Sequence, residues 1–120
     1  MAGSTEASGI RVVTPAGHEP RACDGALSQA FAFLGKRWNA MLISVLGSGP
    51  AGFAELKRTL GISDSMLADR LGELAGAGLV RRTVDAGPPV AVSYELTESG
   101  RALLPALQSI GQWARDNLDA

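Results

Sequence analysis

The sequence predicts a mainly α-helical domain with one small β-hairpin, an α+β fold. Apolar residues recur three and four positions apart in five segments, which is the spacing of a buried helix face. Two segments rich in β-branched residues, 79–85 and 90–96, flank a Gly-Pro-Pro turn at 87–89, which indicates an antiparallel hairpin. Two short helical patterns, 53–60 and 64–77, come directly before this hairpin.

Length and composition predict one folded domain. A chain of 120 residues can bury a core without the support of metals or disulfides. Residues 1–22 are rich in Gly, Ala, Ser, Thr and Pro and predict a flexible N-terminal arm, which leaves 23–120 as the folded domain. No apolar run approaches the roughly 20 residues that cross a bilayer, and the first residues do not resemble a secretion signal. We therefore expect a cytoplasmic protein with no membrane partner.

Catalytic and metal-binding patterns are not evident. Cys23 is the one cysteine and His18 the one histidine, too few for a zinc site, so no metal or other cofactor is expected. There is no paired-carboxylate site, nucleotide-binding loop or Ser-His-Asp arrangement. We expect a protein that is not an enzyme, and catalysis by Cys23 is the least favoured alternative.

Two helices are predicted before residue 50. Asp24 can cap the first, Gly35 can end it, and Phe31 lies on its apolar face. The second begins near Arg37 and stops before the breaker at 47–50, and we expect it to be the central buried helix. Its apolar row is Trp38, Met41, Leu42, Val45 and Leu46. Lys36 and Arg37 oppose the helix dipole at its start, and either a phosphate or solvent would compensate their charges.

The next two segments predict a helix-turn-helix. A short helix at 53–60 leads through Gly61-Ile62-Ser63, a tight connection that suits two steeply crossing helices. The second helix, 64–77, buries a face of Leu67, Leu71 and Leu74. Its opposite face is the candidate surface for reading DNA, and on or near it lie Ser65, Met66, Asp69, Arg70 and Glu73.

The last part of the chain predicts a β-wing over 79–97 and a long helix. Thr97 can cap this helix, which begins at Glu98, and Pro105 is expected to bend it. Two adjacent apolar rows run along it, more than one short domain needs to cover a helix face. The surplus predicts a dimer formed through this helix. The rows are Leu103, Leu107, Ile110 and Ala114, and Leu104, Gly111 and Leu118.

Charge is sparse in the region expected to meet DNA. The net charge of −1 argues against indiscriminate coating of nucleic acid but permits a specific binder whose cations share one face. From 53 to 82 there are five cations and four anions, a local balance of +1. The cations are Lys57, Arg58, Arg70, Arg81 and Arg82, and the anions are Glu55, Asp64, Asp69 and Glu73.

Several blocks together resemble the HxlR family of bacterial winged helix-turn-helix regulators, relatives of the MarR group. They are Cys23, GKRWNAMLISVL at 35–46, FAELKRTLGIS at 53–63, LADRLGELAGAGLVRR at 67–82 and VSYELTESGRALLP at 92–105. The resemblance covers about 23–115. It implies a homodimer with N- and C-terminal dimerisation helices, two recognition helices in successive major grooves of a palindrome, and wings on the flanking DNA.

The resemblance assigns roles to single residues. Ser63, Ser65, Met66, Asp69 and Arg70 fall on the start and exposed face of the family's recognition helix, where Arg can pair with guanine and Ser or a helix N-terminus can hold phosphate. Lys57 and Arg58 would contact the DNA backbone from the supporting helix, and Arg81 and Arg82 from the wing. Solvated side chains are the alternative reading of these charges.

This chain departs from the family in one direction. Members often carry basic residues where Ala51, Gly52, Ser65, Gly72 and Ala91 stand here. Each lost phosphate contact lowers the salt slope by about 0.9, so we expect salt-sensitive binding with modest sequence-independent strength. A winged-helix protein-protein interaction module with little DNA affinity is the alternative function.

Regulation is predicted at two places. Cys23 matches a cysteine that can sense oxidants or electrophiles in many members, and the helix start favours its thiolate while Asp24 opposes it. A structural buried thiol is the alternative. A small-molecule effector is expected near Phe31, Trp38 or Trp113, although Trp38 also suits the core. The resemblance implies a transcription regulator. We expect this regulator to act as a repressor and to be associated with the nucleoid.

Overall fold

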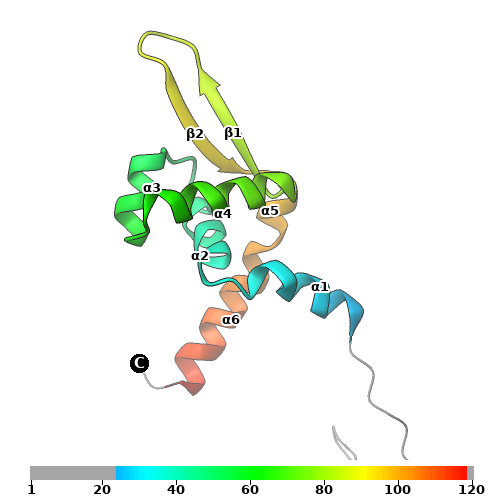
Figure 1. The fold of residues 1–120 in the computed structure, drawn as a ribbon. Coiled ribbons are helices and arrows are strands. Elements are labelled where there is room, and N and C mark those ends of the chain that lie inside the picture. The colour runs from blue at the N-terminus through cyan, green and yellow to red at the C-terminus, as the bar shows by residue number, and fades with distance from the viewer. Residues whose placement is uncertain (1–23, 119–120) are drawn as a thin grey trace, which may run out of the picture.

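The computed structural model describes residues 24–118, which form six helices and one hairpin (Figure 1). The predicted arm at 1–22 and Cys23 lie outside the described residues. In chain order the elements are α1 (Gly25–Leu34), α2 (Arg37–Leu46), α3 (Phe53–Leu60), α4 (Asp64–Gly76), β1 (Val80–Asp85), β2 (Ala91–Leu96), α5 (Glu98–Ala102) and α6 (Leu104–Asn117). The prediction of a mainly helical fold with one hairpin is confirmed.

Capping residues define the helix ends as the sequence predicts. Asp24 Oδ1 accepts hydrogen bonds from the backbone N–H groups of Ala26 and Leu27 at 2.9 and 3.2 Å, and α1 ends at Gly35. Gly61, with φ of 67°, turns the chain between α3 and α4 in a left-handed conformation that favours glycine. The ends of α1 and the turn of the helix-turn-helix can therefore be predicted from these local sequence signals.

Apolar side chains from α2, α3 and α4 form the core together with residues at the base of the hairpin and in the loops on either side of α3. The predicted faces of α3 and α4 are confirmed, with Leu56, Leu67 and Leu74 fully buried. The buried face of α2 differs from the predicted row. It contains Leu42 and Leu46 as expected, but also Asn39 and Ile43, which were not in that row. Met41, predicted to be apolar core, is 48% exposed, since it lies on the side of α2 opposite Ile43 and Asn39.

The hairpin projects from one end of the helical body, and α6 extends from the other (Figure 1). Each strand is one residue shorter than predicted, and the register runs from Val80 opposite Leu96 to Asp85 opposite Ala91. Ala51 adds a bridge to β2, with backbone N···O distances of 3.0 and 2.8 Å to Tyr94. The hairpin is thus anchored to the body at its base.

The predicted final helix is two helices. Thr97 caps α5 as expected, with its Oγ accepting from the Gly100 N–H, but the chain breaks at Leu103 and restarts as α6. Pro105 lies in the first turn of α6, where its missing N–H would have no helical partner in any case. A single bent helix was therefore the wrong prediction, because proline begins a new helix here.

Candidate nucleic-acid interface

Helix α4 presents a stripe of small and polar residues to solvent. Four exposed positions are spaced three and four apart, as one helix face requires, and they are Ser65, Ala68, Asp69 and Gly72. We call these four residues the outward stripe. Ala68 and Gly72 were not predicted as site residues, although counting forward from Ser65 would have found them. Small side chains allow the helix backbone to approach a partner closely.

The start of α4 is capped by Ser63. Its Oγ accepts a hydrogen bond from the Met66 N–H at 3.2 Å, which leaves other first-turn N–H groups facing solvent. Asp64 also lies in this first turn, so the predicted attraction of the N-terminus for phosphate acts against a local carboxylate.

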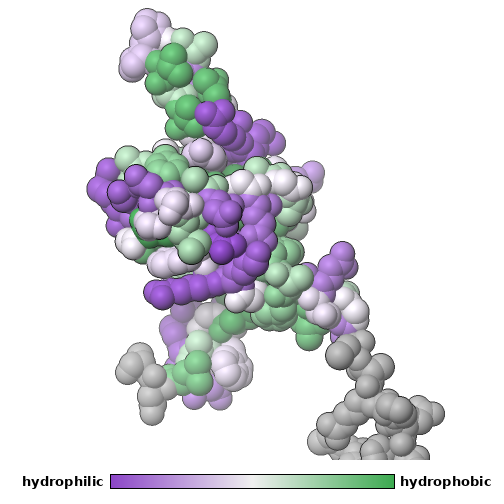
Figure 2. All heavy atoms as spheres, viewed as in Figure 1, coloured by the Kyte–Doolittle hydropathy of each residue, from purple (hydrophilic) through white to green (hydrophobic). Residues whose placement is uncertain are grey.

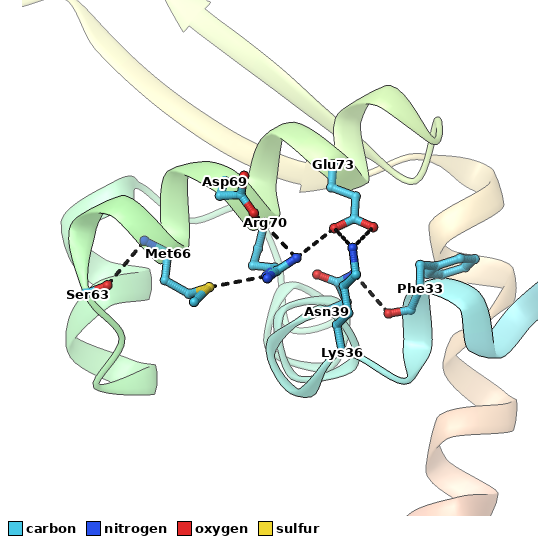
Figure 3. A network of polar contacts seen from close by, with 8 residues as sticks. All are labelled: Phe33, Lys36, Asn39, Ser63, Met66, Asp69, Arg70 and Glu73. Atoms are coloured by element: carbon cyan, nitrogen blue, oxygen red, sulfur yellow. Dashed lines mark hydrogen bonds and ion pairs between the residues drawn. The ribbon is translucent and has the colours of Figure 1, made fainter.

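Arg70 and Met66 lie on the flank of α4 rather than on its exposed face. The Arg70 side chain is 18% exposed, and its Nη1 lies 2.9 Å from Glu73 Oε1 and 3.4 Å from Asp69 Oδ2. Its Nε donates to the Met66 sulfur at 3.3 Å (Figure 3). Met66 and Arg70, predicted to lie on or near the exposed face of the recognition helix, are therefore half-buried at its edge, because Arg70 folds along the helix toward its own carboxylates.

Glu73 joins α4 to the start of α2. The Lys36 ammonium donates to both carboxylate oxygens of Glu73, at 3.0 and 3.2 Å (Figure 3). This hydrogen bond from Lys36 is the main cause of a lowered pKa for Glu73, to which the Asn39 amide and the Arg70 guanidinium add. The compensation expected for Lys36 at this helix start thus comes from a carboxylate, while Arg37 lies 4.5 Å from the Trp38 ring.

A buried amide lies beside this ion pair. Asn39 is fully buried, and its Nδ2 donates to the Phe33 carbonyl in the last turn of α1 at 3.0 Å. Lys36 and Asn39 therefore place the junction of α1 and α2 next to Glu73 (Figure 3). Sequence reasoning missed Asn39, because a polar residue in an apolar helix pattern gives no sign of which face it occupies.

The remaining predicted cations divide into paired and unpaired residues. Lys57 lies 2.8 Å from Asp64, and Arg81 lies 3.3 Å from Glu95 across the hairpin. Arg58 and Arg82 are exposed, and neither has a carboxylate partner within residues 24–118. The predicted DNA-facing region therefore carries fewer available cations than its sequence suggests.

Apolar side chains are exposed along α1 and α6. Phe31 is 49% exposed and Trp113 is 57% exposed, and they share this property with Leu27, Ile110 and Leu118. Phe31 lines an open depression on α1 together with Asp24, Leu27 and Ser28. Trp38 and Trp113 do not line this depression, and the effector site near Phe31, Trp38 or Trp113 stays a prediction. Figure 2 also shows apolar side chains on the outer part of the hairpin, where Val84 and Val90 are exposed.

Residues 24–118 contain neither a candidate membrane-spanning helix nor a candidate metal site. None of the helices there has the length and apolar character to cross a membrane. In the same part of the chain, no three His, Cys, Asp or Glu side chains are grouped so that they could hold a metal ion.

Comparison with known proteins places this architecture in a family. The HxlR-like helix-turn-helix family matches residues 33–120. The HTH-type transcriptional regulator YodB of Bacillus subtilis is 46% identical over 89 residues, which cover 73% of this chain and 80% of YodB. The solved reduced form of YodB superposes with a TM-score of 0.74 at 41% identity, over 82% of this chain and 97% of that one.

Two further solved structures are similar. The quinone-bound form of B. subtilis YodB has a TM-score of 0.68 at 41% identity and covers 78% of this chain and 99% of its own. The reduced form of the redox regulator HypR has a TM-score of 0.74 at 31% identity and covers 79% of this chain and 95% of its own. The chain therefore belongs to the HxlR-like helix-turn-helix family of transcriptional regulators.

Proposed function

We propose that this DNA-binding transcriptional regulator is a homodimeric repressor that reads a palindromic operator with two copies of α4. The observation that carries the proposal is the outward stripe, a solvent-facing row on the second helix of a helix-turn-helix with an anchored hairpin beside it. A recognition helix enters the major groove with its N-terminal half, and a projecting hairpin can follow the flanking backbone. The proposed folded unit is 23–120, with 1–22 as an arm.

Base reading falls to the N-terminal half of α4. Asp69 can accept a hydrogen bond from a cytosine amino group, and the Ala68 methyl can contact a thymine methyl. Ser63 and Ser65 can donate to phosphate or base edges at the helix start. Met66 and Arg70 flank this surface, and Arg70 would read a guanine after it turns away from Glu73.

Backbone contacts position the dimer without specifying sequence. We assign this role to Lys57 and Arg58 on α3 and to Arg81 and Arg82 on β1. Arg58 and Arg82 carry most of it, because Lys57 and Arg81 each already face a carboxylate. Surface ion pairs are weak, so Lys57 and Arg81 can still exchange their partners for phosphate at a reduced gain.

Dimerisation is proposed through α1 and α6. These helices expose Leu27, Phe31, Ile110 and Trp113, and none of these four side chains belongs to the core. Exposed apolar rows on neighbouring helices are typical of an interface between subunits. A symmetric pair of α4 helices then follows from the two-fold axis of the dimer.

A redox or small-molecule signal is proposed to modulate binding. Relatives include a redox regulator and a regulator solved with quinone bound. Cys23 directly precedes Asp24, the cap of α1, so a change at its thiol would act on the proposed dimer helix. The thiolate would add to a ring C=C bond of an electrophilic quinone: the S–C bond forms as the π electron pair moves to a carbonyl oxygen, which takes a proton from solvent. Transfer of the ring hydrogen to the second oxygen then gives a hydroquinone thioether. A thiol pKa at or above that of free cysteine would count against sensing, as measured by alkylation rate against pH.

We also propose that the protein lies in the cytoplasm at the nucleoid and that it acts by binding rather than by catalysis. Peroxide turnover with a recycling thiol would contradict the absence of catalysis. A winged-helix protein-protein interaction module with little DNA affinity is the competing function. Its basis is that four cations are paired with carboxylates, because a paired cation is less available to phosphate.

Footprinting the region upstream of the gene tests the proposed function. We expect protection of a palindrome whose half-sites lie about one helical turn apart. Failure to protect any palindrome at low salt would contradict the dimeric reader. A protein carrying Asp69→Ala and Ala68→Glu serves as the matched control, since both positions are exposed and their substitution should abolish protection while the fold persists.

A further inference from the structure

Four charged side chains of α2 and α4 form a compact group, which we call the Glu73 cluster: Lys36, Asp69, Arg70 and Glu73. Lys36 and Arg70 supply two positive charges, and Asp69 and Glu73 supply two negative charges. Glu73 is its centre, because its carboxylate contacts Lys36 through both oxygens and Arg70 through one. The cluster is electrically neutral, although two of its members are long cations beside a DNA-reading helix.

The cluster pairs both cations with carboxylates of α4. Arg70 is mostly covered, and two of its guanidinium nitrogens are engaged, one by carboxylates and one by the Met66 sulfur. Lys36 is bent back onto α4 from the start of α2, where the helix dipole by itself would disfavour a cation. Without Glu73, Lys36 and Arg70 would each seek another anion, and in DNA that anion is phosphate.

We propose that Glu73 sets the strength of sequence-independent DNA binding by withholding Lys36 and Arg70 from the phosphate backbone. This inference rests on the proposed DNA binding. Sequence-independent affinity grows with the number of phosphates neutralised, and each contributes about 0.9 to the slope of log K against log salt. Glu73 lowers the number of neutralised phosphates without contacting DNA itself. Because Gln is nearly the same size as Glu, the substitution Glu73→Gln removes the charge and little else.

The test compares Glu73→Gln with Glu55→Gln. Glu55 is an exposed glutamate in the first turn of α3 with no ion-pair partner among residues 24–118, so its substitution removes the same charge without releasing a cation. Binding is measured by fluorescence anisotropy on a scrambled duplex from 50 to 300 mM salt. We expect Glu73→Gln to raise affinity about tenfold at low salt and to steepen the slope by about 1 for each released cation. Equal effects of the two substitutions would overturn the inference.

Arg70→Met supplies a second arm. In the wild-type background this change should lower the scrambled-duplex affinity and the salt slope less than it does in the Glu73→Gln background, because the Arg70 guanidinium is there paired with Glu73. In the Glu73→Gln background the same change should remove about one phosphate from the slope per subunit. Identical effects in the two backgrounds would overturn the inference. If Glu73→Gln folds poorly by circular dichroism, Glu73→Met gives the same comparison with a side chain of similar length.

The result is separable from the proposed function. If the wild type protects its upstream palindrome but Glu73→Gln and Glu55→Gln behave alike, the inference fails and the proposed function stands. If the wild type protects nothing and only Glu73→Gln binds duplex, the withholding role is supported and the proposed function fails. If no variant binds duplex at 50 mM salt, both are overturned.

Discussion

Lys36 and Glu73 are 37 positions apart in the sequence, and the Lys36 Nζ lies 3.0 Å from the Glu73 Oε2. Lys36 lies two residues beyond the end of α1 and is the N-cap of α2, and Glu73 lies in the second half of α4. The proposed dimer helix and the proposed recognition helix are therefore connected through one ion pair. Because half-exposed ion pairs are individually weak, its importance lies in where it holds charge rather than in stability.

Stability should depend on Glu73 in a defined pH window. The folded state lowers the pKa of Glu73 below its usual 4.5, so the carboxylate contributes stability above that pH and loses it as pH falls through the folded value. The urea midpoint of wild type should exceed that of Glu73→Gln at pH 7, and the difference should shrink toward pH 3. A difference that stays constant to pH 3 would contradict the prediction.

Two glycine substitutions should act in opposite directions. A Cβ at Gly100 would lie 2.2 Å from the Leu79 carbonyl oxygen, so Gly100→Ala should destabilise the fold by about 2 kcal/mol or more. A Cβ at Gly72 meets nothing within 4 Å, so Gly72→Ala should stabilise α4 by about 0.5 to 1 kcal/mol. Urea unfolding of both variants checks this pair. Equal midpoints for the two variants would show that the packing at Gly100 is not as described.

Unpaired and paired cations should differ in DNA binding. Arg58→Ala and Arg82→Ala should each flatten the salt slope by about 1 to 2 for a dimer, because each removes a free phosphate contact per subunit. Lys57→Ala and Arg81→Ala should change the slope less, since Asp64 and Glu95 already neutralise them. Anisotropy titrations at several salt concentrations measure all four. The division into two classes fails if the paired residues contribute as much as the free ones.

Dimerisation should depend on Trp113. Trp113→Asp places a charge within the exposed apolar row of α6 and should shift the protein to monomer at micromolar concentration, as measured by analytical ultracentrifugation. Val90→Asp is the matched control, because Val90 is also a strongly exposed apolar residue but lies on the hairpin. A monomeric control, or a dimeric Trp113→Asp protein, would place the subunit interface elsewhere.

Much of the fold could be predicted from sequence because its signals are local. Asp24, Gly61 and Thr97 each perform the capping or turning role expected of their residue type. The predictions that were wrong rest on local signals that are compatible with two different structures. Pro105 can bend a helix or begin one, and only tertiary packing, with Gly100 of α5 against the Leu79 carbonyl just before β1, decides for a new helix.

The candidate site was predictable in position but not in charge state. Spacing alone places Ser65 and Asp69 outward and Leu67 inward. The conformation of Arg70 depends on Glu73 one turn later and, through it, on Lys36 from another helix. A contact between residues so far apart in sequence leaves no periodic trace, which is why the Glu73 cluster emerged only in three dimensions.

The most direct test of DNA reading by this sparsely charged surface is the salt dependence of binding to the protected upstream palindrome and to a scrambled duplex of equal length. With Arg58 and Arg82 as the two unpaired cations of the predicted DNA-facing region, 53–82, in each subunit, log K should fall linearly with log salt at a slope of about 3 to 6, and the palindrome should bind at least about a hundredfold more tightly. A slope near zero, or equal affinity for the two duplexes, would contradict the account and favour an interaction module.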